Sequence, residues 1–342
     1  MTPSPMADTP DVARALGRVL ARQAGMNGEI HGLRRLTGGA TKQTWALQWH
    51  CGGKSQALIL QQTPAAAAPP GRVPKLDARQ DASLMLAARA GGVPAPVVRL
   101  LLEPEDGLGE GYVTEHVAGE TLGRRIVQDD AFAGARKVMA RQCGEILAGI
   151  HRLPQAALSF LNTLSPAQEL DVYGELLEQC GVRHPALAYA FRWTKERLPT
   201  RWEPALVHAD FRTGNLIVGP EGVRCVLDWE IARIGDPMQD LGVLCMRSWR
   251  FGGAGEVGGF GAREDLYAGY ESVSGQPVDR ERVRFWEAFS NLKWAIACAR
   301  RGMARRSDGR QASLELSAVG RRLGEPLWDF LMLAGPVQAR SM

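Results

Sequence analysis

The chain has 342 residues, of which 45% are hydrophobic and 23% are charged. This length is enough for one large domain or two lobes, and the composition is typical of a soluble globular protein. The formal net charge is only +4 and the charges are spread evenly, which argues against a nucleic-acid partner. No apolar run reaches the roughly 18 residues of a membrane span, so no membrane partner is expected.

The six cysteines are scattered along the chain and form no C-x-x-C pattern. Metal sites and disulfides are therefore disfavoured, and buried free thiols in a reducing cytoplasm are expected. The N-terminal stretch "MTPSPMADTPDVARALG" lacks the basic and apolar regions of a signal peptide, which also favours a cytoplasmic location.

The N-terminal part of the chain alternates strand-like runs with turns. Apolar side chains at helical spacing over residues 10–24 predict a first helix. The stretch "LRRLTGGATKQTWALQW" predicts two strands joined by a turn at Gly38 and Gly39, and "SQALILQQ" predicts a third strand. A helix is predicted from Asp77 to Ala90, and "GYVTEHV" predicts a further strand. We therefore expect an antiparallel unit of about five strands with one long helix over residues 25–115.

The rest of the chain is mainly helical, over residues 120–200 and 240–335. One β feature lies between these ranges, a hairpin of "NLIV", a four-residue loop "GPEG" and "VRCVLDW". A hinge is expected near Glu115 to Val117. The predicted fold class is therefore α+β, with a small antiparallel β-rich lobe, residues 1–117, a large mainly helical lobe, residues 118–342, and a cleft between them.

The stretch "LVHADFRTGNLIV" carries polar residues between apolar anchors. Its Asp210 and Asn215 have the D-x-x-x-x-N spacing of a phosphoryl-transfer loop, where Asp orients or deprotonates the attacking hydroxyl and Asn holds Mg²⁺. Asp228, in "VLDWE", is expected to end the second hairpin strand and face Asn215. Mg²⁺ takes one or two hard oxygen ligands from protein, which this pair supplies. Each Asp alone is better explained as a turn or strand-end residue, but the whole set in this order favours chemistry.

The stretches "LVHADFRTGNLIV" and "VLDWEIARIGDPMQDLG" resemble the aminoglycoside phosphotransferase and choline kinase superfamily, which has a protein-kinase-like bilobal fold. The resemblance runs from "LTGGAT" to about residue 335, and it is closest to bacterial phosphotransferase-family proteins related to the kinase-like domains joined to acyl-CoA dehydrogenases. It implies that Asp210 is the catalytic base, that His208 and Arg212 support the loop, and that Asn215 and Asp228 bind Mg²⁺.

The resemblance also implies roles for residues around this core. Asp236 and Asp240, in "GDPMQDLG", would be helix-capping acceptors that brace the site. ATP would lie under the "TGGAT" turn, with Gly38, Gly39 and Thr41 close to its phosphates.

Further nucleotide contacts are expected from both ends of the small lobe. Lys42 stands where relatives usually carry Asn, and Glu115 and Val117 form the hinge. The other five histidines are interpreted as surface or packing residues.

The small lobe departs from the family pattern in "LILQQTP". Relatives have Lys or Arg directly after this strand to clamp the α- and β-phosphates, whereas this chain has Gln61. The helix Glu that pairs with that cation appears as Asp81. Gln cannot supply the charge, and losing one preorganised donor costs about 10²–10³ in rate, which implies a slow kinase rather than an inactive one. Lys42 and Lys75 are candidates for the missing charge.

These features predict an ATP- and Mg²⁺-dependent phosphotransferase that acts on a hydroxyl of a small molecule. Residues 241–342 carry 15 Arg and Lys against 11 Asp and Glu, a balance that favours a neutral or anionic acceptor over a polycationic aminoglycoside. The relatives joined to acyl-CoA dehydrogenases favour a hydroxy acid or hydroxyacyl-CoA. The alternative is a pseudokinase-like module that binds a nucleotide or acyl-CoA without turnover, which Gln61 and Asp81 motivate.

Overall fold

The computed structural model describes residues 9–36, 42–63, 73–305, 309–311 and 313–335. The chain divides into two compact units. The first unit consists of Met1–Ala118 together with Cys225–Glu230, and the second consists of Gly119–Arg224 together with Ile231–Met342. The segment that carries Asp228 is therefore part of the first unit, although it follows the loop that carries Asp210 in sequence.

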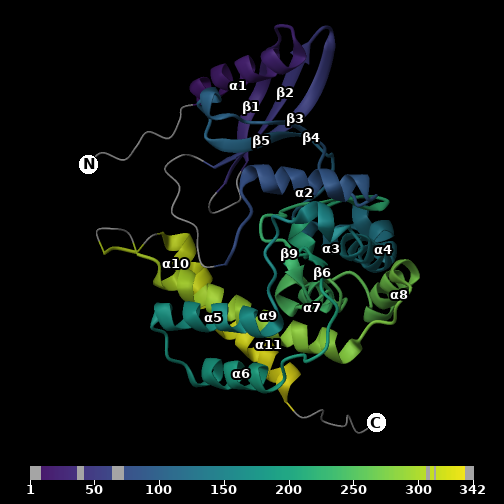
Figure 1. The fold of residues 1–342 in the computed structure, drawn as a ribbon, viewed down its shortest axis with the longest axis vertical. Helices are drawn as coiled ribbons and strands as arrows, with labels where there is room; N and C mark the ends of the chain where they lie inside the picture. The colour runs from purple at the N-terminus through teal and green to yellow at the C-terminus, as the bar shows by residue number, and fades with distance from the viewer. Residues whose placement is uncertain (1–8, 37–41, 64–72, 306–308, 312, 336–342) are drawn as a thin grey trace. The chain divides into compact units, whose positions relative to one another are not determined.

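The first unit is built on a five-stranded antiparallel sheet (Figure 1). The order of the strands is β1-β2-β3-β5-β4, so β5 pairs with β3 and β4 lies at the edge of the sheet. The strands are β1 (Glu29–Leu36), β2 (Gln43–Cys51), β3 (Lys54–Thr63), β4 (Val98–Leu101) and β5 (Glu110–Glu115). The prediction of about five antiparallel strands is confirmed, and β4 is a strand that the sequence patterns did not locate.

One face of this sheet forms the hydrophobic core of the first unit. Trp45 and Leu60 are direct partners on β2 and β3, and both are buried. The helix α1 (Thr9–Ala24) lies across this face (Figure 1) and buries Leu16 against it. Because successive side chains of a strand point to opposite faces, Thr44, Gln61 and other residues of the alternate register lie on the other face.

The helix α2 (Ala78–Ala90) contacts β4 and β5. It begins at Asp77, whose side chain accepts a hydrogen bond from the Gln80 backbone while the Gln80 side chain accepts one from the Asp77 backbone. This reciprocal capping box fixes the start of the helix. Asp81 follows in the first turn and is buried. The predicted helix is confirmed, and a 3-10 helix, η1 (Pro104–Asp106), precedes β5.

The second unit is mainly helical, as predicted. The long helix α9 lies at its centre and contacts α5, α6, α7, α10 and α11. The helices are α3 (Gly123–Gln128), α4 (Ala133–His151), α5 (Pro166–Cys180), α6 (Pro185–Glu196), α7 (Met238–Cys245), α8 (Arg263–Ser274), α9 (Arg280–Met303), α10 (Leu314–Arg321) and α11 (Gly324–Ala334). Short 3-10 helices are η2 (Asp130–Phe132), η3 (Gln155–Leu158), η4 (Thr213–Asn215) and η5 (Arg247–Trp249).

Two glycines allow α4 and α8 to pack backbone against backbone. A Cβ atom on Gly144 would overlap the backbone oxygen of Leu266, and one on Gly269 would overlap the backbone oxygen of Arg141. Any larger side chain at either position would push the helices apart. This contact fixes α4, whose last residue is His151, a neighbour of the candidate site.

The second unit contains more β structure than the single predicted hairpin. Strands β6 (Ala205–Val207) and β9 (Arg233–Gly235) pair antiparallel on either side of it in sequence. These strands have only three residues each, which is too short for an alternation pattern to be visible. The hairpin itself is confirmed as β7 (Leu216–Gly219) and β8 (Gly222–Val226).

Two details of the hairpin prediction were wrong. The connection between β7 and β8 is two residues long, Pro220 and Glu221, because both flanking glycines belong to the strands. Asp228 does not end β8 but lies two residues beyond it, with a φ angle of 67°. This left-handed conformation takes the chain out of the extended geometry of a strand.

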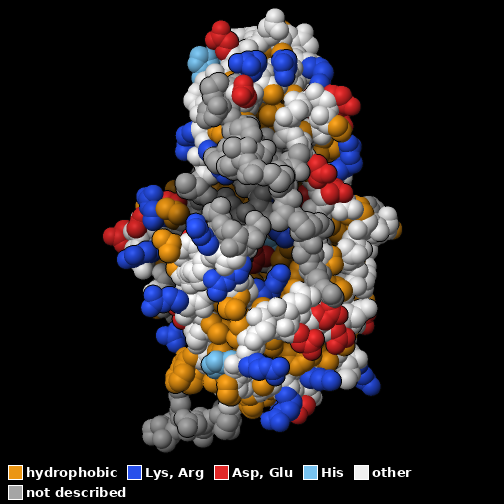
Figure 2. Space-filling model, turned by 90° about the vertical axis from the view of Figure 1, so that its left-hand side faces the viewer, with side chains coloured by type: hydrophobic (Ala, Val, Ile, Leu, Met, Phe, Trp, Pro, Cys, Tyr) orange, Lys and Arg blue, Asp and Glu red, His pale blue; other side chains and the backbone are white. Residues whose placement is uncertain are grey.

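All six cysteines are free thiols, as expected, and four of them are buried. Cys51 and Cys180 are half-buried. None of the described helices combines the length and hydropathy needed to span a membrane. Acidic and basic side chains are both present on the face shown in Figure 2, which agrees with the small net charge.

Candidate active site

The loop between β6 and η4 is held by a carboxylate from α7. The backbone N–H groups of His208 and Ala209 donate to the two carboxylate oxygens of Asp240 at 2.8 Å and 2.7 Å. Ala209 has a φ angle of 68°. This left-handed residue lets successive N–H groups point at one anion, as in other backbone anion-binding turns.

Asp240 is itself supported from α4. His151 Nε2 lies 3.1 Å from an Asp240 oxygen, and His151 Nδ1 lies 3.0 Å from the Tyr270 hydroxyl. Burial opposes ionisation of Asp240, but His151 and the backbone donors outweigh it and lower the pKa of the carboxyl. Asp240 therefore braces the loop, as expected, but it does so through the loop backbone and not as a helix cap.

Asp236 is closer to the expected capping role. Its carboxylate accepts hydrogen bonds from the Met238 backbone at 3.0 Å and from Trp286 Nε1 at 2.7 Å. Arg282 lies 3.4 Å from the same carboxylate. Burial raises the pKa of Asp236 despite these partners. The residue fixes the start of α7 and ties it to α9.

The Asp210 side chain accepts hydrogen bonds from two residues of its own loop. Arg212 Nε donates to both Asp210 oxygens at 3.1 Å, and Asn215 Nδ2 donates to Asp210 Oδ2 at 2.8 Å. The Arg212 guanidinium also stacks on Trp249, 4.6 Å from the ring centroid. The Asp210 carboxylate is therefore held by fixed donors, while 27% of the side chain remains exposed.

His208 is fully buried beneath this loop. Its Nδ1 accepts a hydrogen bond from the Asp210 backbone at 3.3 Å, and its ring meets Phe211 edge to face. The imidazole is therefore placed to support the loop rather than to contact a substrate. Its predicted role in catalysis stays a prediction.

The side chain of Asn215 uses its amide nitrogen within the loop. Its amide nitrogen makes both hydrogen bonds to Asp210, one to the carboxylate and one to the backbone oxygen at 2.9 Å. The amide oxygen is the remaining atom, and it is the type of hard ligand that Mg²⁺ prefers.

In the first unit, Lys42 lies between two carboxylates. Its ammonium is 2.9 Å from Asp81 and 3.1 Å from Glu230. Burial disfavours the charged form, but the two carboxylates outweigh it and raise the pKa of Lys42. Lys75 forms a second ion pair with Glu230. Burial opposes ionisation of Glu230, but Lys42 and Lys75 outweigh it and lower the pKa of that carboxyl.

Gln61 faces the same cluster. Strand register places Thr44 opposite Gln61, and Gln61 opposite Tyr112. The Tyr112 hydroxyl donates to Asp81 at 2.8 Å and also contacts the Gln61 side-chain oxygen. By the family resemblance, Gln61 stands at the position of a cation and Asp81 at the position of its acidic partner. Tyr112 contacts both side chains and so connects them.

Asp228 is exposed and belongs to the same unit as this cluster. Burial raises the pKa of Tyr112 well above its usual range, and the charges of Asp81, Asp228 and Glu230 add to the effect. The convergence of Asp210, Asn215 and Asp228 stays a prediction.

The remaining predicted nucleotide contacts fall into two groups. Gly38, Gly39 and Thr41 lie outside the described residues. Glu115 ends β5 and forms an ion pair with Arg99, and Val117 is half-buried just before the boundary of the unit. Their role in binding a nucleotide stays a prediction.

Four residues of the site were not found from the sequence. Tyr112 could have been found by pairing "LILQQ" with "GYVTE" in antiparallel register, which places it beside Gln61. Glu230 follows Asp228 by two residues, in the same short stretch "VLDWE". His151 was predicted to be a surface or packing residue, but it contacts Asp240. Trp249 has no local signal, because it meets Arg212 only through the tertiary fold.

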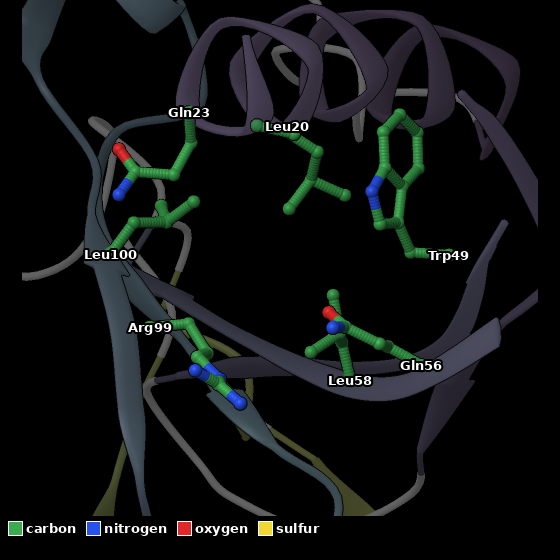
Figure 3. A pocket seen from close by; sticks show the side chains of 8 residues that line it. Leu20, Gln23, Trp49, Gln56, Leu58, Arg99 and Leu100 are labelled. Atoms are coloured by element: carbon green, nitrogen blue, oxygen red, sulfur yellow. The ribbon is translucent and has the colours of Figure 1, made fainter. Parts of the chain in front are cut away.

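A separate cavity of about 240 Å³ lies under α1 (Figure 3). Figure 3 shows Leu20 and Gln23 pointing down from α1 into the cavity, with Trp49 at its right-hand side and Leu58 below. Trp49 and Leu58 belong to the core face, opposite to the face that carries Gln61. None of the predicted site residues lines this cavity, so it is not the candidate active site.

Comparison with curated proteins finds animal relatives of greater length. The chain is 26% identical over 279 residues to acyl-CoA dehydrogenase family member 10 of Mus musculus, covering 74% of the chain and 25% of that protein. It is 29% identical over 217 residues to acyl-CoA dehydrogenase family member 11 of Mus musculus, covering 56% of the chain and 25% of that protein. The chain thus spans about a quarter of the length of these relatives.

Solved structures share the fold. A candidate aminoglycoside phosphotransferase from Ralstonia eutropha JMP134 matches with a TM-score of 0.72 and 22% identity, covering 94% of this chain and 97% of that one. Spectinomycin phosphotransferase APH(9)-Ia, solved with ADP and spectinomycin, matches with a TM-score of 0.64 and 14% identity, covering 93% and 98%. The predicted kinase-like fold is confirmed.

The family assignment rests on most of the chain. A model of the phosphotransferase enzyme family matches residues 32–286, a range that includes Lys42, Gln61 and the loop around Asp210. The predicted resemblance to this family is confirmed, and so is the predicted similarity to acyl-CoA dehydrogenase family members. The chain belongs to the phosphotransferase enzyme family.

Proposed function

We propose that this phosphotransferase moves the γ-phosphoryl group of ATP, in the presence of Mg²⁺, to a hydroxyl group of a small molecule. The observation that carries the proposal is the position of Asp210. It is held by Arg212 and Asn215 in a loop whose backbone is fixed by Asp240. A carboxylate held this firmly, and still partly exposed, is suited to orient and deprotonate an attacking hydroxyl.

The proposed reaction is an in-line displacement. The hydroxyl oxygen bonds to the γ-phosphorus, the bond from that phosphorus to the oxygen bridging to the β-phosphate breaks, and the hydroxyl proton passes to Asp210. Asn215 and Asp228 would hold Mg²⁺, which supplies positive charge to the phosphates. The amide oxygen of Asn215 and the exposed carboxylate of Asp228 have the chemistry for this role. His208 and Arg212 would keep the loop in shape.

We propose a neutral or anionic acceptor, such as a hydroxy acid or hydroxyacyl-CoA, before an aminoglycoside. Support comes from the excess of Arg and Lys over Asp and Glu in residues 241–342 and from relatives that are acyl-CoA dehydrogenase family members. The six free thiols support a reducing compartment such as the cytoplasm as the place of action.

The test is a screen of hydroxylated metabolites for acceptor-dependent ADP release with Mg²⁺ and ATP. Asp210→Asn should lower turnover by about 10²–10⁴ while nucleotide binding is kept, because the carboxylate acts on the acceptor. Asp171→Asn, at an exposed position of α5, is the matched control and should be as active as the wild type. Full activity of Asp210→Asn would remove Asp210 as the base.

A second candidate function is a module that binds a nucleotide or acyl-CoA without turnover. It is favoured by Gln61, which contacts neutral Tyr112 and carries no charge for a phosphate. Thermal shift separates the candidates, since a ligand that binds only the folded state stabilises it. Stabilisation by ATP or acyl-CoA together with no ADP release from any acceptor would support this alternative.

A further inference from the structure

We propose that Lys42, immediately before β2, is the cation that contacts the nucleotide phosphates in this chain, with Asp81 on α2 as its anchoring partner. In this arrangement the positive charge comes from a residue immediately before β2 and not from the end of β3, where Gln61 stands. The inference rests on the proposed function, which requires a phosphate-binding cation in the first unit.

The register of the sheet brings the two positions together. Thr44 is the direct partner of Gln61 on the neighbouring strand. Since side chains alternate between faces along a strand, Lys42 lies on the same face as Thr44 and therefore on the same face as Gln61. A long side chain from position 42 reaches the space beside position 61, and the Lys42 ammonium is found there, 2.9 Å from Asp81.

Asp81 is built into the unit as a partner for a cation. Its carboxylate is 1% exposed and accepts from the Tyr112 hydroxyl at 2.8 Å and from Lys42 on the same oxygen, Oδ2. Among the described residues, no donor reaches the other oxygen, Oδ1. The only other described donor to this buried carboxylate is the neutral Tyr112 hydroxyl, so Lys42 supplies the charge that neutralises it. Separating the pair would leave a buried charge without a partner, which is strongly unfavourable.

Lys42 keeps capacity for a further anion. An ammonium has three N–H donors, and the two carboxylates, Asp81 and Glu230, account for two of them. The side chain is 19% exposed, so the third donor can reach a phosphate oxygen. Gln61 contacts the Tyr112 hydroxyl and stands beside the pair as a neutral side chain.

Lys75 is the competing candidate and is placed differently. It pairs with Glu230 and is 38% exposed, and its described ion pair does not involve Asp81. An arrangement in which the phosphate-binding lysine is anchored by the acidic residue of the helix therefore fits Lys42 and not Lys75. Replacing the two lysines separately distinguishes the candidates.

The experiment measures binding of Mg²⁺ and a non-hydrolysable ATP analogue by titration calorimetry, together with ADP release. Lys42→Ala should weaken binding at least tenfold and lower turnover by about 10²–10³, the usual loss for one preorganised donor. Lys75→Ala should lose less than Lys42→Ala, and Lys54→Ala, at an exposed strand end, is the control that should match the wild type. Lys42→Ala/Gln61→Lys should turn over at least tenfold faster than Lys42→Ala. The reason is that a lysine at position 61 can approach Asp81 Oδ1, the oxygen that no described donor reaches.

A folding defect would not hide the result. If Lys42→Ala unfolds because Asp81 is left buried without a cation, Lys42→Ala/Asp81→Asn removes the pair together and can be assayed in its place. Wild-type binding of the analogue by Lys42→Ala, or an equal loss in Lys75→Ala, overturns the role of Lys42 and leaves the proposed function standing. Wild-type protein that binds no nucleotide overturns both, whereas binding without turnover overturns only the transfer reaction.

Discussion

The carboxylate of Asp240 accepts a 2.7 Å hydrogen bond from the backbone N–H of Ala209, 31 residues earlier in the chain. Ala209 is in a left-handed conformation, which costs a residue with a Cβ roughly 1–2 kcal/mol. The charged acceptor offsets this cost, because hydrogen bonds to an ionised group are about twice as strong as neutral ones. The shape of the loop that carries Asp210 therefore depends on a residue of α7.

Asp240→Asn should both destabilise the protein and slow it. The amide has one accepting oxygen for two backbone donors, and its NH₂ group faces N–H groups that already donate. We expect the free energy of unfolding to fall by about 2–4 kcal/mol in urea titration, with a loss of turnover larger than the loss of nucleotide affinity. Asp265→Asn, at an exposed position of α8, is the control. Unchanged stability and turnover would show that the loop holds its shape without the carboxylate.

Arg212→Lys should affect turnover more than binding. Arg212 Nε reaches both oxygens of Asp210 while its guanidinium stacks on Trp249, and an ammonium can reproduce neither the planar contact nor the stack. Because small displacements of a reacting group cost about 10²-fold, we expect kcat to fall by about that factor with little change in KM for ATP. Arg192→Lys, on the exposed surface of α6, should behave as wild type. A rise in KM for ATP alone would mean that Arg212 serves binding instead.

The second unit also contains a buried ion cluster. Glu169 on α5 lies 2.5 Å from Arg233 on β9 and 2.8 Å from Lys293 on α9. Glu169→Gln would leave two buried cations facing each other, so we expect a loss of about 3–5 kcal/mol in the free energy of unfolding. Lys293→Met keeps the Arg233–Glu169 pair and should cost less. If Glu169→Gln is as stable as the wild type, water reaches this cluster.

The same cluster sets a pH dependence. Burial works against ionisation of Glu169, but Arg233 and Lys293 outweigh it and lower its pKa from 4.5 to about 2. Lys293 shares this single carboxylate with Arg233, and for that reason burial dominates and the pKa of Lys293 is lowered. Since the folded-state pKa of Glu169 is depressed, its contribution to stability is present above pH 4.5 and is lost as the pH falls toward 2.

The loss of stability in acid should therefore be smaller in a protein that lacks Glu169. Between pH 4.5 and about pH 2, urea titrations should show a smaller fall in the free energy of unfolding for Glu169→Gln/Lys293→Met than for the wild type. Glu264→Gln, at an exposed position of α8, should keep the full change. Equal slopes in all three proteins would contradict the depressed pKa of Glu169.

Local sequence patterns were enough to predict the loop that carries Asp210 and the strand and helix that carry Gln61 and Asp81. The spacing of Asp210 and Asn215 predicted the loop, the run "SQALILQQ" predicted β3, and the helical range from Asp77 to Ala90 predicted α2. These signals are local because strand alternation and helix capping act over a few residues.

Other features could not be predicted because they depend on tertiary contacts. The pairing of Lys42 with Asp81 joins positions 39 residues apart and needs the sheet register and the orientation of α2. The reach of Asp240 to the loop backbone depends on how α7 packs, which no motif specifies. Strands β6 and β9 have three residues each, so their pairing is decided by the surrounding helices and not by alternation.

Asp228→Asn should remove the part of nucleotide binding that depends on Mg²⁺. An amide cannot neutralise the ion as a carboxylate does, so the metal-linked affinity should fall while metal-free binding stays the same. A ligand at 100 times its Kd stabilises the folded state by about 2.7 kcal/mol, which makes the effect visible as a shift in Tm.

We therefore expect the wild type to gain more Tm from the ATP analogue with Mg²⁺ than with EDTA, and Asp228→Asn to show the same gain in both. Asn215→Ala should reduce the Mg²⁺-dependent gain as well, because it removes the amide oxygen proposed as the second ligand. Asp11→Asn, at an exposed position of α1, should retain the wild-type difference. A full Mg²⁺-dependent shift in Asp228→Asn would show that the cation is held by other oxygens, and the proposed metal pair would then be wrong even if Asp210 proves to be the base.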